Sequence, residues 1–102
     1  MMKTATASLL HVPSIAVKAS SPILHTLMLR ERDVHSLDLR EGERCILSFR
    51  NGVAWVTMEG NPDDFALTKD SPPSEFTGPG RLVIEAIGGE VKLEAVLARE
   101  AD

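Results

Sequence analysis

Three carboxylates close together in the chain are the first candidates for chemistry. Glu59, Asp63 and Asp64 span six positions, and carboxylate oxygens are the ligands that a hard cation such as Ca²⁺ prefers. The two aspartates also directly follow Pro62, and Asp side chains in turns usually bond nearby backbone amides. We therefore favour a turn-capping role for Asp63 and Asp64 over a cation site.

The single cysteine, Cys45, could be a nucleophile. One cysteine excludes an internal disulfide and an all-cysteine metal cluster within one chain. The sequence contains no Gly-x-Ser-x-Gly elbow, phosphate loop or dinucleotide fingerprint. Because the alternating pattern around Cys45 puts it on an apolar face, we expect a buried, unreactive thiol.

The only tryptophan, Trp55, is the strongest candidate for a binding residue, because the large area of its ring must be covered by something. We expect the segment Ile23 to Leu29 to fold over it. The alternatives are a homodimer contact and a small-molecule pocket walled by Trp55. The polar anchors of such a pocket would be Arg50, Arg44 and Thr57.

A predicted hairpin positions these side chains. Asn51-Gly52 is the strongest short hairpin signal, because a type I′ turn needs positive φ at both central residues. A two-residue turn makes one face wholly apolar, with the pairs Phe49/Ala54, Leu47/Val56 and Cys45/Met58. The other face carries Trp55 beside Ser48, Ile46 and Thr57, with Arg50 opposite Val53 and Arg44 opposite Glu59.

Gly88-Gly89 predicts a second hairpin of the same kind. Its apolar face pairs Ala86/Val91, Ile84/Leu93 and Leu82/Ala95, and Glu85 faces Lys92 on the wet side. Each hairpin has one apolar face, and packing the two hairpins against each other buries both faces. This arrangement predicts a small β-sandwich or barrel. A change of one residue in either loop would exchange the faces.

Shorter strands complete the predicted domain. Val34 to Arg40 is its first strand, and Phe65 to Thr68 and Glu75 to Thr77 are short strands between the hairpins, which gives six or seven antiparallel strands. Turns are predicted at residues 41–43, 60–64 and 78–80. Ile23 to Leu29 fits neither helical nor alternating spacing well, so its structure stays open.

The length of 102 residues, with 43% hydrophobic and 25% charged residues, fits one soluble domain. We expect residues 1–33 to be an N-terminal arm, partly disordered or docked on the sheet. Residues 34–98 would form the β-barrel domain and residues 99–102 a tail.

The charge balance argues against nucleic acid as a partner. The chain has 11 Lys and Arg against 15 Asp and Glu, whereas phosphate binding depends on clustered cations. The first 20 residues resemble a secretory signal only in part, because His11, Pro13 and Lys18 interrupt it. Since no apolar run approaches the ~20 residues of a membrane span, we expect a cytoplasmic protein without a membrane partner.

One stretch of the chain resembles a known bacterial family. The run Asn51 to Gly60, followed by Asp63-Asp64, Leu67, Asp70 and the strand Leu82 to Ala86, is similar to domain of unknown function 2917 (DUF2917). The recurring sequence pattern of that family is a glycine, a Trp-x-Thr strand, a turn with Asp, then Leu and Gly-Asp. The resemblance covers roughly residues 34 to 97. It implies a small cupin-like all-β domain with no established activity and no catalytic residues to carry over.

The chain departs from the DUF2917 pattern at Lys69, where the family usually has glycine, and in its longer N-terminal arm. Metal-binding cupins hold their ion with two histidines one residue apart, a nearby carboxylate and a third, later histidine. His11, His25 and His35 all precede the first predicted hairpin and lack this spacing. We therefore expect neither a metal nor another cofactor.

The leading interpretation is a non-catalytic small β-barrel that acts as a binding or interaction module. The alternative is a metal-independent cupin-like enzyme that uses carboxylates and a histidine on a small-molecule substrate. Such an enzyme needs His35 within reach of Asp63, Asp64 or Glu59 in a cleft. An interior filled by apolar side chains favours the binding module over the enzyme. The side chains expected there are Leu47, Val56, Met58, Leu82, Ile84 and Leu93.

Overall fold

The computed structural model describes residues 22–99, and these residues form six strands. The strands are β1 (Ile23–Leu29), β2 (Val34–Leu39), β3 (Glu43–Met58), β4 (Asp64–Thr68), β5 (Ser74–Thr77) and β6 (Gly80–Arg99). Every pairing between them is antiparallel. The expected all-β class is confirmed, and the short strands predicted around residues 65–68 and 75–77 are β4 and β5.

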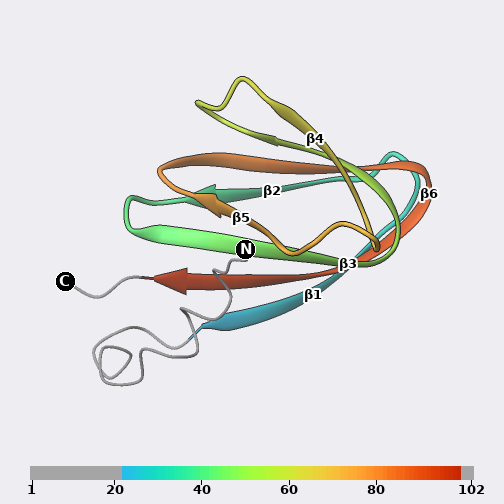
Figure 1. Cartoon of the computed structure of the whole chain (residues 1–102), viewed down its shortest axis with the longest axis horizontal. Coiled ribbons are helices and arrows are strands. Elements are labelled where there is room, and N and C mark those ends of the chain that lie inside the picture. Colours follow the sequence, from blue (N-terminus) through green and yellow to red (C-terminus); the bar gives the residue numbers. More distant parts are fainter. Residues whose placement is uncertain (1–21, 100–102) are drawn as a thin grey trace.

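The two long strands, β3 and β6, pair with each other along most of their length and bend together (Figure 1). Before the bend, residues 43–49 of β3 pair with residues 93–99 of β6. After it, residues 53–58 pair with residues 82–87. The register shifts on both sides of Asn51, so that the pairing passes from Lys92 to Ile87 while β3 advances from Asn51 to Val53.

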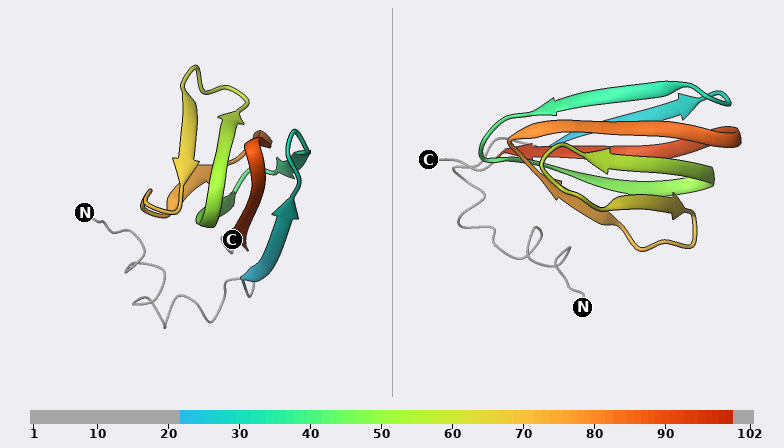
Figure 2. Two further views of the ribbon diagram at one scale, coloured as in Figure 1. Left: turned by 90° about the vertical axis from the view of Figure 1, so that its right-hand side faces the viewer. Right: turned by 90° about the horizontal axis from the view of Figure 1, so that it is seen from above.

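This bend folds the hydrogen-bonded sheet into two layers, which Figure 2 shows from two sides. Layer 1 consists, in order, of β1, residues 91–99 of β6, residues 43–49 of β3, and β5. Layer 2 consists of β2, residues 80–87 of β6, residues 53–58 of β3, and β4. Along each strand, side chains alternate between the interior and the outer face of the layer.

The two predicted hairpins are wrong. Asn51-Gly52 and Gly88-Gly89 lie inside the continuous strands β3 and β6, and Leu47 pairs with Ala95 rather than with Val56. A two-residue turn and a bulged bend both change which residues of an alternating strand point inward. The inward side chains are therefore the predicted ones, although their strand partners are not.

Glycine is required at the bend of β3. Gly52 has a φ of 84°, a conformation that side chains with a Cβ rarely adopt. A Cβ at this position would also meet the carbonyl oxygen of Glu90 and the Cα of Val91 on β6. The close approach of the two strands at the bend thus depends on the missing side chain.

Apolar side chains fill the interior between the layers. All six residues expected there are buried, with at most 6% of each side chain exposed: Leu47, Val56, Met58, Leu82, Ile84 and Leu93. Cys45 is fully buried beside them, and burial raises the pKa of its thiol to about 12. Within residues 22–99, no polar or charged residue is buried.

The first strand of the sheet is β1, which precedes the predicted first strand at Val34. The boundary expected at residue 33 falls in the tight turn between β1 and β2, where Asp33 N–H donates to the Arg30 carbonyl oxygen over 2.9 Å. Part of the predicted N-terminal arm is therefore an edge strand of layer 1. The signal-like segment before residue 22 and the end of the predicted tail after residue 99 lie outside the described residues.

No helix among the described residues is long and apolar enough to span a membrane.

Candidate functional site

The outer face of layer 2 carries four large apolar side chains that remain exposed. They are Val34 (58% exposed), Val53 (39%), Trp55 (41%) and Ile87 (42%), and we call them the Trp55 patch. Val53 pairs with Ile87, while Glu85 pairs with both Val34 and Trp55, so the four side chains occupy two adjacent rows across the sheet. A group of exposed apolar side chains on neighbouring strands, unlike a single exposed residue, is a candidate contact surface.

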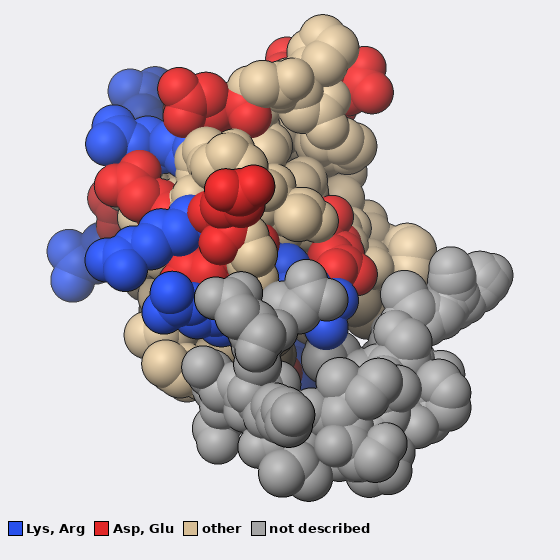
Figure 3. Space-filling view, turned by 90° about the vertical axis from the view of Figure 1, so that its left-hand side faces the viewer, with Lys and Arg blue, Asp and Glu red and all other residues tan. Residues whose placement is uncertain are grey.

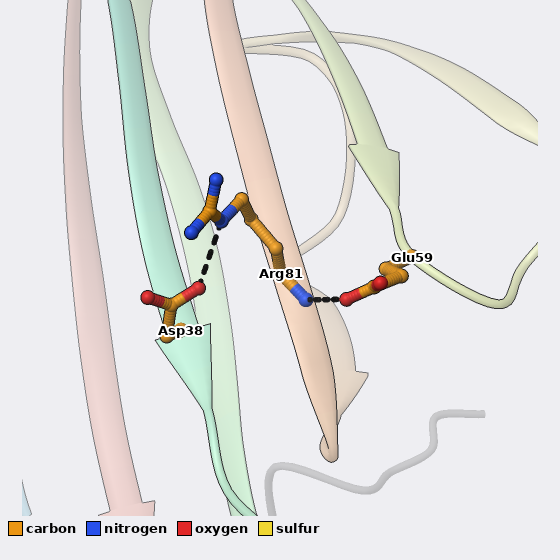
Figure 4. Close-up of polar contacts among 3 residues, drawn as sticks. All are labelled: Asp38, Glu59 and Arg81. Carbon is orange, nitrogen blue, oxygen red and sulfur yellow. Dashed lines mark hydrogen bonds and ion pairs between the residues drawn. The ribbon is translucent and has the colours of Figure 1, made fainter.

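A groove of about 530 Å³ continues this face toward one end of the molecule. Thr57 and Val83 line it next to the Trp55 patch, and Asp38, Glu59 and Arg81 supply its charged groups. Figure 4 shows that Arg81 lies between the two carboxylates. Its Nε donates to Asp38 Oδ1 over 2.9 Å, and its backbone N–H donates to Glu59 Oε1 over 3.0 Å.

The electrostatics of the groove are dominated by these contacts. The hydrogen bond and positive charge of Arg81 lower the pKa of Asp38, and Asp38, with a smaller contribution from Glu59, raises the pKa of Arg81. Both side chains of the ion pair are largely exposed, so solvent screens it and it adds little to stability. The groove therefore presents hydrogen-bonding groups that water or a ligand can still reach.

Charges on the neighbouring end of the molecule are mixed rather than separated by sign. Seen from the left-hand side of Figure 1, acidic and basic side chains lie next to one another (Figure 3). The outer face of layer 2 is more acidic, because its described residues include four carboxylates, Asp38, Glu59, Asp64 and Glu85, but one cation, Arg81.

The structure separates the four predicted ligand-binding residues into two pairs. Arg44 and Arg50 precede the bend and lie on the outer face of layer 1, where Arg44 is 3.6 Å from Glu75 and Arg50 is 2.9 Å from Glu94. Trp55 and Thr57 follow the bend and lie together on the outer face of layer 2.

The cross-strand partners of Trp55 differ from those of the predicted hairpin, because β3 bends at Asn51-Gly52 instead of folding back on itself. Trp55 lies beside Glu85 and Ala66, not beside Ser48. The cover expected from residues 23–29 is also wrong, because β1 extends layer 1 at its edge while Trp55 belongs to layer 2.

The predicted role of the two aspartates in the turn is taken by another residue. Asp63 N–H donates to Asn61 Oδ1 over 2.9 Å, so Asn61 caps the turn. Asn followed by Pro62 is itself a turn signal, and it could have identified this residue from the sequence. Within residues 22–99, no three His, Cys, Asp or Glu side chains are grouped so that they could hold a metal ion.

The enzyme alternative needs a histidine beside a carboxylate, and the structure separates His35 from Asp64, whereas Glu59 lies in the groove and accepts from the Arg81 backbone N–H. His35 lies on β2 opposite the buried Ile84, so its side chain is on the inner side of layer 2. Asp64 lies on β4, at the other edge of the same layer. Two strands lie between β2 and β4, which corresponds to roughly 14 Å.

Comparisons with known proteins identify the fold. The sequence matches no established family profile and none of the curated proteins. The structure is similar to that of a predicted oxalate decarboxylase from Thermotoga maritima, with a TM-score of 0.62 and 16% identity over 85% of this chain and 72% of that one. It is also similar to a de novo designed double-stranded β-helix, with a TM-score of 0.51 and 12% identity over 74% of this chain and 97% of that one.

At these identities the likeness shows the fold alone. The chain has the cupin-like double-stranded β-helix fold, as expected from its sequence. Its resemblance to DUF2917 stays a prediction.

Proposed function

We propose that this chain is a non-catalytic binding module that holds its partner on the outer face of layer 2. The division of its apolar side chains carries the proposal. Inward residues such as Leu47, Ile84 and Leu93 are at most 1% exposed and fill the space that a ligand inside the barrel would need. The Trp55 patch, in contrast, is exposed beside a groove that offers polar groups.

The chemistry of this face favours a partner that combines an apolar group with a cationic group. Burial of the Trp55 patch stabilises a complex by about 25 cal/mol per Å² of apolar area. Glu85 lies between Val34 and Trp55 in the middle of the patch, and a cationic group of the partner would form an ion pair with its carboxylate. A second copy of the same acidic face would instead bring like charges together.

Trp55 is the central residue of the proposed surface. Its neighbour on β4 is Ala66, whose single methyl group covers little of the indole ring. The exposed ring can therefore pack against an apolar group, and its face also attracts a guanidinium or ammonium group. Such a group could bind the indole and the Glu85 carboxylate at the same time.

A titration of the full chain with hexylguanidinium tests the proposal, because this probe joins an apolar chain to a cation. We expect NMR shifts at Val53, Trp55 and Ile87, together with a change in the fluorescence of the only tryptophan. Hexanol and guanidinium, each alone at the same concentration, should produce weaker shifts. Shifts confined to layer 1, or equal shifts with all three compounds, would contradict the proposal.

Three variants sharpen the titration. Trp55→Ser and Glu85→Gln should each weaken hexylguanidinium binding by roughly threefold or more, because each removes one of the two groups that the probe contacts. Ile46→Ser is the matched control, since Ile46 lies on the outer face of layer 1. The Ile46→Ser variant should bind hexylguanidinium with the same affinity as the unmodified chain.

The structural neighbour is a predicted oxalate decarboxylase, and at 16% identity its predicted activity does not carry over to this chain. We do propose a cytoplasmic location for the module. Its one cysteine, Cys45, is a buried free thiol, so the fold needs no oxidising compartment. Fractionation of cells that express the chain tests this location.

A further inference from the structure

Strand β1 forms an unusual edge of the barrel. Among residues 22–99 it pairs with β6 alone, and between Pro22 and Arg30 it contains no charged residue. Ile23, Leu24 and Met28 are each 57–59% exposed. An uncharged apolar edge strand is a template for pairing with a further strand, because its outer backbone groups need partners.

The other edges of the sheet are protected in ways that β1 is not. Strand β5 has four residues and lies between Pro72-Pro73 and Pro79. Strand β4 has five residues and begins with an aspartate. Strand β2 carries Asp38 in an ion pair with Arg81. Short length, proline and charge are the features by which proteins prevent pairing at an edge.

The sequence of β1 is nearly symmetric in hydrophobicity about its central residue, Thr26. Antiparallel pairing of two copies about a two-fold axis at Thr26 would place Leu24 opposite Met28 of the second copy. Both side chains are on the outer face of layer 1, because they pair with Val96 and Lys92 of β6, which also point outward. Each pairing would thus bury two exposed apolar side chains against each other.

We propose that a second copy of this chain docks on β1, so that two copies form one continuous sheet of eight strands from their two layers 1. The uncharged β1 offers no charge complementarity to a charged partner, whereas a second β1 matches it in hydrophobicity at every position except His25, which would lie opposite Leu27. In a chain with a net charge of −4, this uncharged edge is where two copies can meet with little repulsion. A contact formed by one seven-residue strand from each copy is expected to bury less than the ~1,600 Å² of a standard interface, so we expect a dissociation constant of roughly tens of micromolar.

Sedimentation velocity on the full chain, from about 5 to about 500 µM, tests the dimer in the range where weak interfaces dissociate. The mass should rise from 11.1 kDa toward twice that value. Thr26→Glu and Thr26→Lys should each remain monomeric, because position 26 would face the same charge across the axis. An equimolar mixture of these two variants should form a heterodimer again.

Two further measurements keep the proposal falsifiable. Circular dichroism and thermal unfolding establish that the variants fold, as expected for an exposed residue on an edge strand. If they do not fold, an equimolar mixture of Leu24→Glu with Met28→Lys tests the same register. A monomeric wild type at all concentrations, variants that dimerise like wild type, or a folded mixture that stays monomeric would each overturn the proposal.

Ser36→Glu on β2 is the matched control, because Ser36 is exposed on another edge strand, and it should dimerise like wild type. Trp55→Ser should also dimerise, which separates this contact from the proposed binding face. Loss of the dimer in Trp55→Ser but not in Thr26→Glu would overturn the β1 contact and place the dimer on layer 2.

Discussion

The two layers of the barrel share a pair of long strands and a common interior, but their outer faces differ. On layer 1, the ion pairs Arg44–Glu75 and Arg50–Glu94 connect β3 to its neighbouring strands, and exposed apolar side chains lie on the edge strand β1. On layer 2, the ion pair Arg81–Asp38 connects β6 to the edge strand β2, and three of the four exposed apolar side chains of the Trp55 patch lie on the central strands β3 and β6. The difference arises within β3, whose outward residues are mainly polar before the bend and mainly apolar after it. One strand can therefore supply a solvated face and a contact face without a change in the interior.

Substitutions in the interior that the two layers share should have the largest effects on the free energy of unfolding. Leu47→Ala in layer 1 and Ile84→Ala in layer 2 should each lower the free energy of unfolding by about 2–5 kcal/mol, because both remove buried methyl groups and leave a cavity. Ile87→Ala on the outer face of layer 2 is the control and should cost less than about 1 kcal/mol. Urea unfolding measures all three, and an equal loss for Ile84→Ala and Ile87→Ala would contradict the assignment of the two faces.

The next largest effect is expected at the bend that joins the layers. Gly52→Ala should lower the free energy of unfolding by roughly 2–4 kcal/mol, because it combines a left-handed backbone with a collision against Glu90. Gly88→Ala has a similar φ of 73° but open space around the added Cβ, so about 1 kcal/mol is expected. Equal losses in urea unfolding would show that the close approach of β3 and β6 does not matter.

The stability of the protein should depend on pH through Cys45, which lies on the inner side of layer 1. Burial raises the pKa of this thiol from 9.0 to about 12, so the folded state keeps its proton when the unfolded chain loses it. The contribution of the Cys45 thiol to the free energy of unfolding is complete below pH 9.0 and decreases as the pH rises toward about 12. Urea midpoints should therefore fall less with pH in Cys45→Ala than in wild type. Identical pH profiles, or rapid thiol reaction of the native protein near neutral pH, would contradict this burial.

The smallest effect is expected from the ion pairs on layer 1. A double-mutant cycle with Arg50→Ala and Glu94→Gln should give a coupling energy of about 0.2–1 kcal/mol, because Arg50 is largely exposed. The coupling should decrease at high salt. A coupling that persists in salt would mean that the pair is more shielded from solvent than the structure indicates.

Part of the candidate site could be predicted from the sequence. Trp55 and Thr57 alternate on one strand, so their common face follows from local spacing. Asp38 and Arg81 could not be found in this way, because they come from β2 and β6, which meet only through sheet pairing. The same limit applies to Arg50, whose partner Glu94 is remote in the chain.

The all-β class and the identity of the inward side chains could be inferred from the sequence, because alternation and its reversal at Asn51-Gly52 are local properties of the chain. The pairing of β3 with β6 rather than with itself could be seen only in the folded protein. A tight turn and a bulged bend produce the same alternation, and the choice between them depends on contacts with distant strands. That choice also placed Trp55 and Arg50 on different faces of the protein.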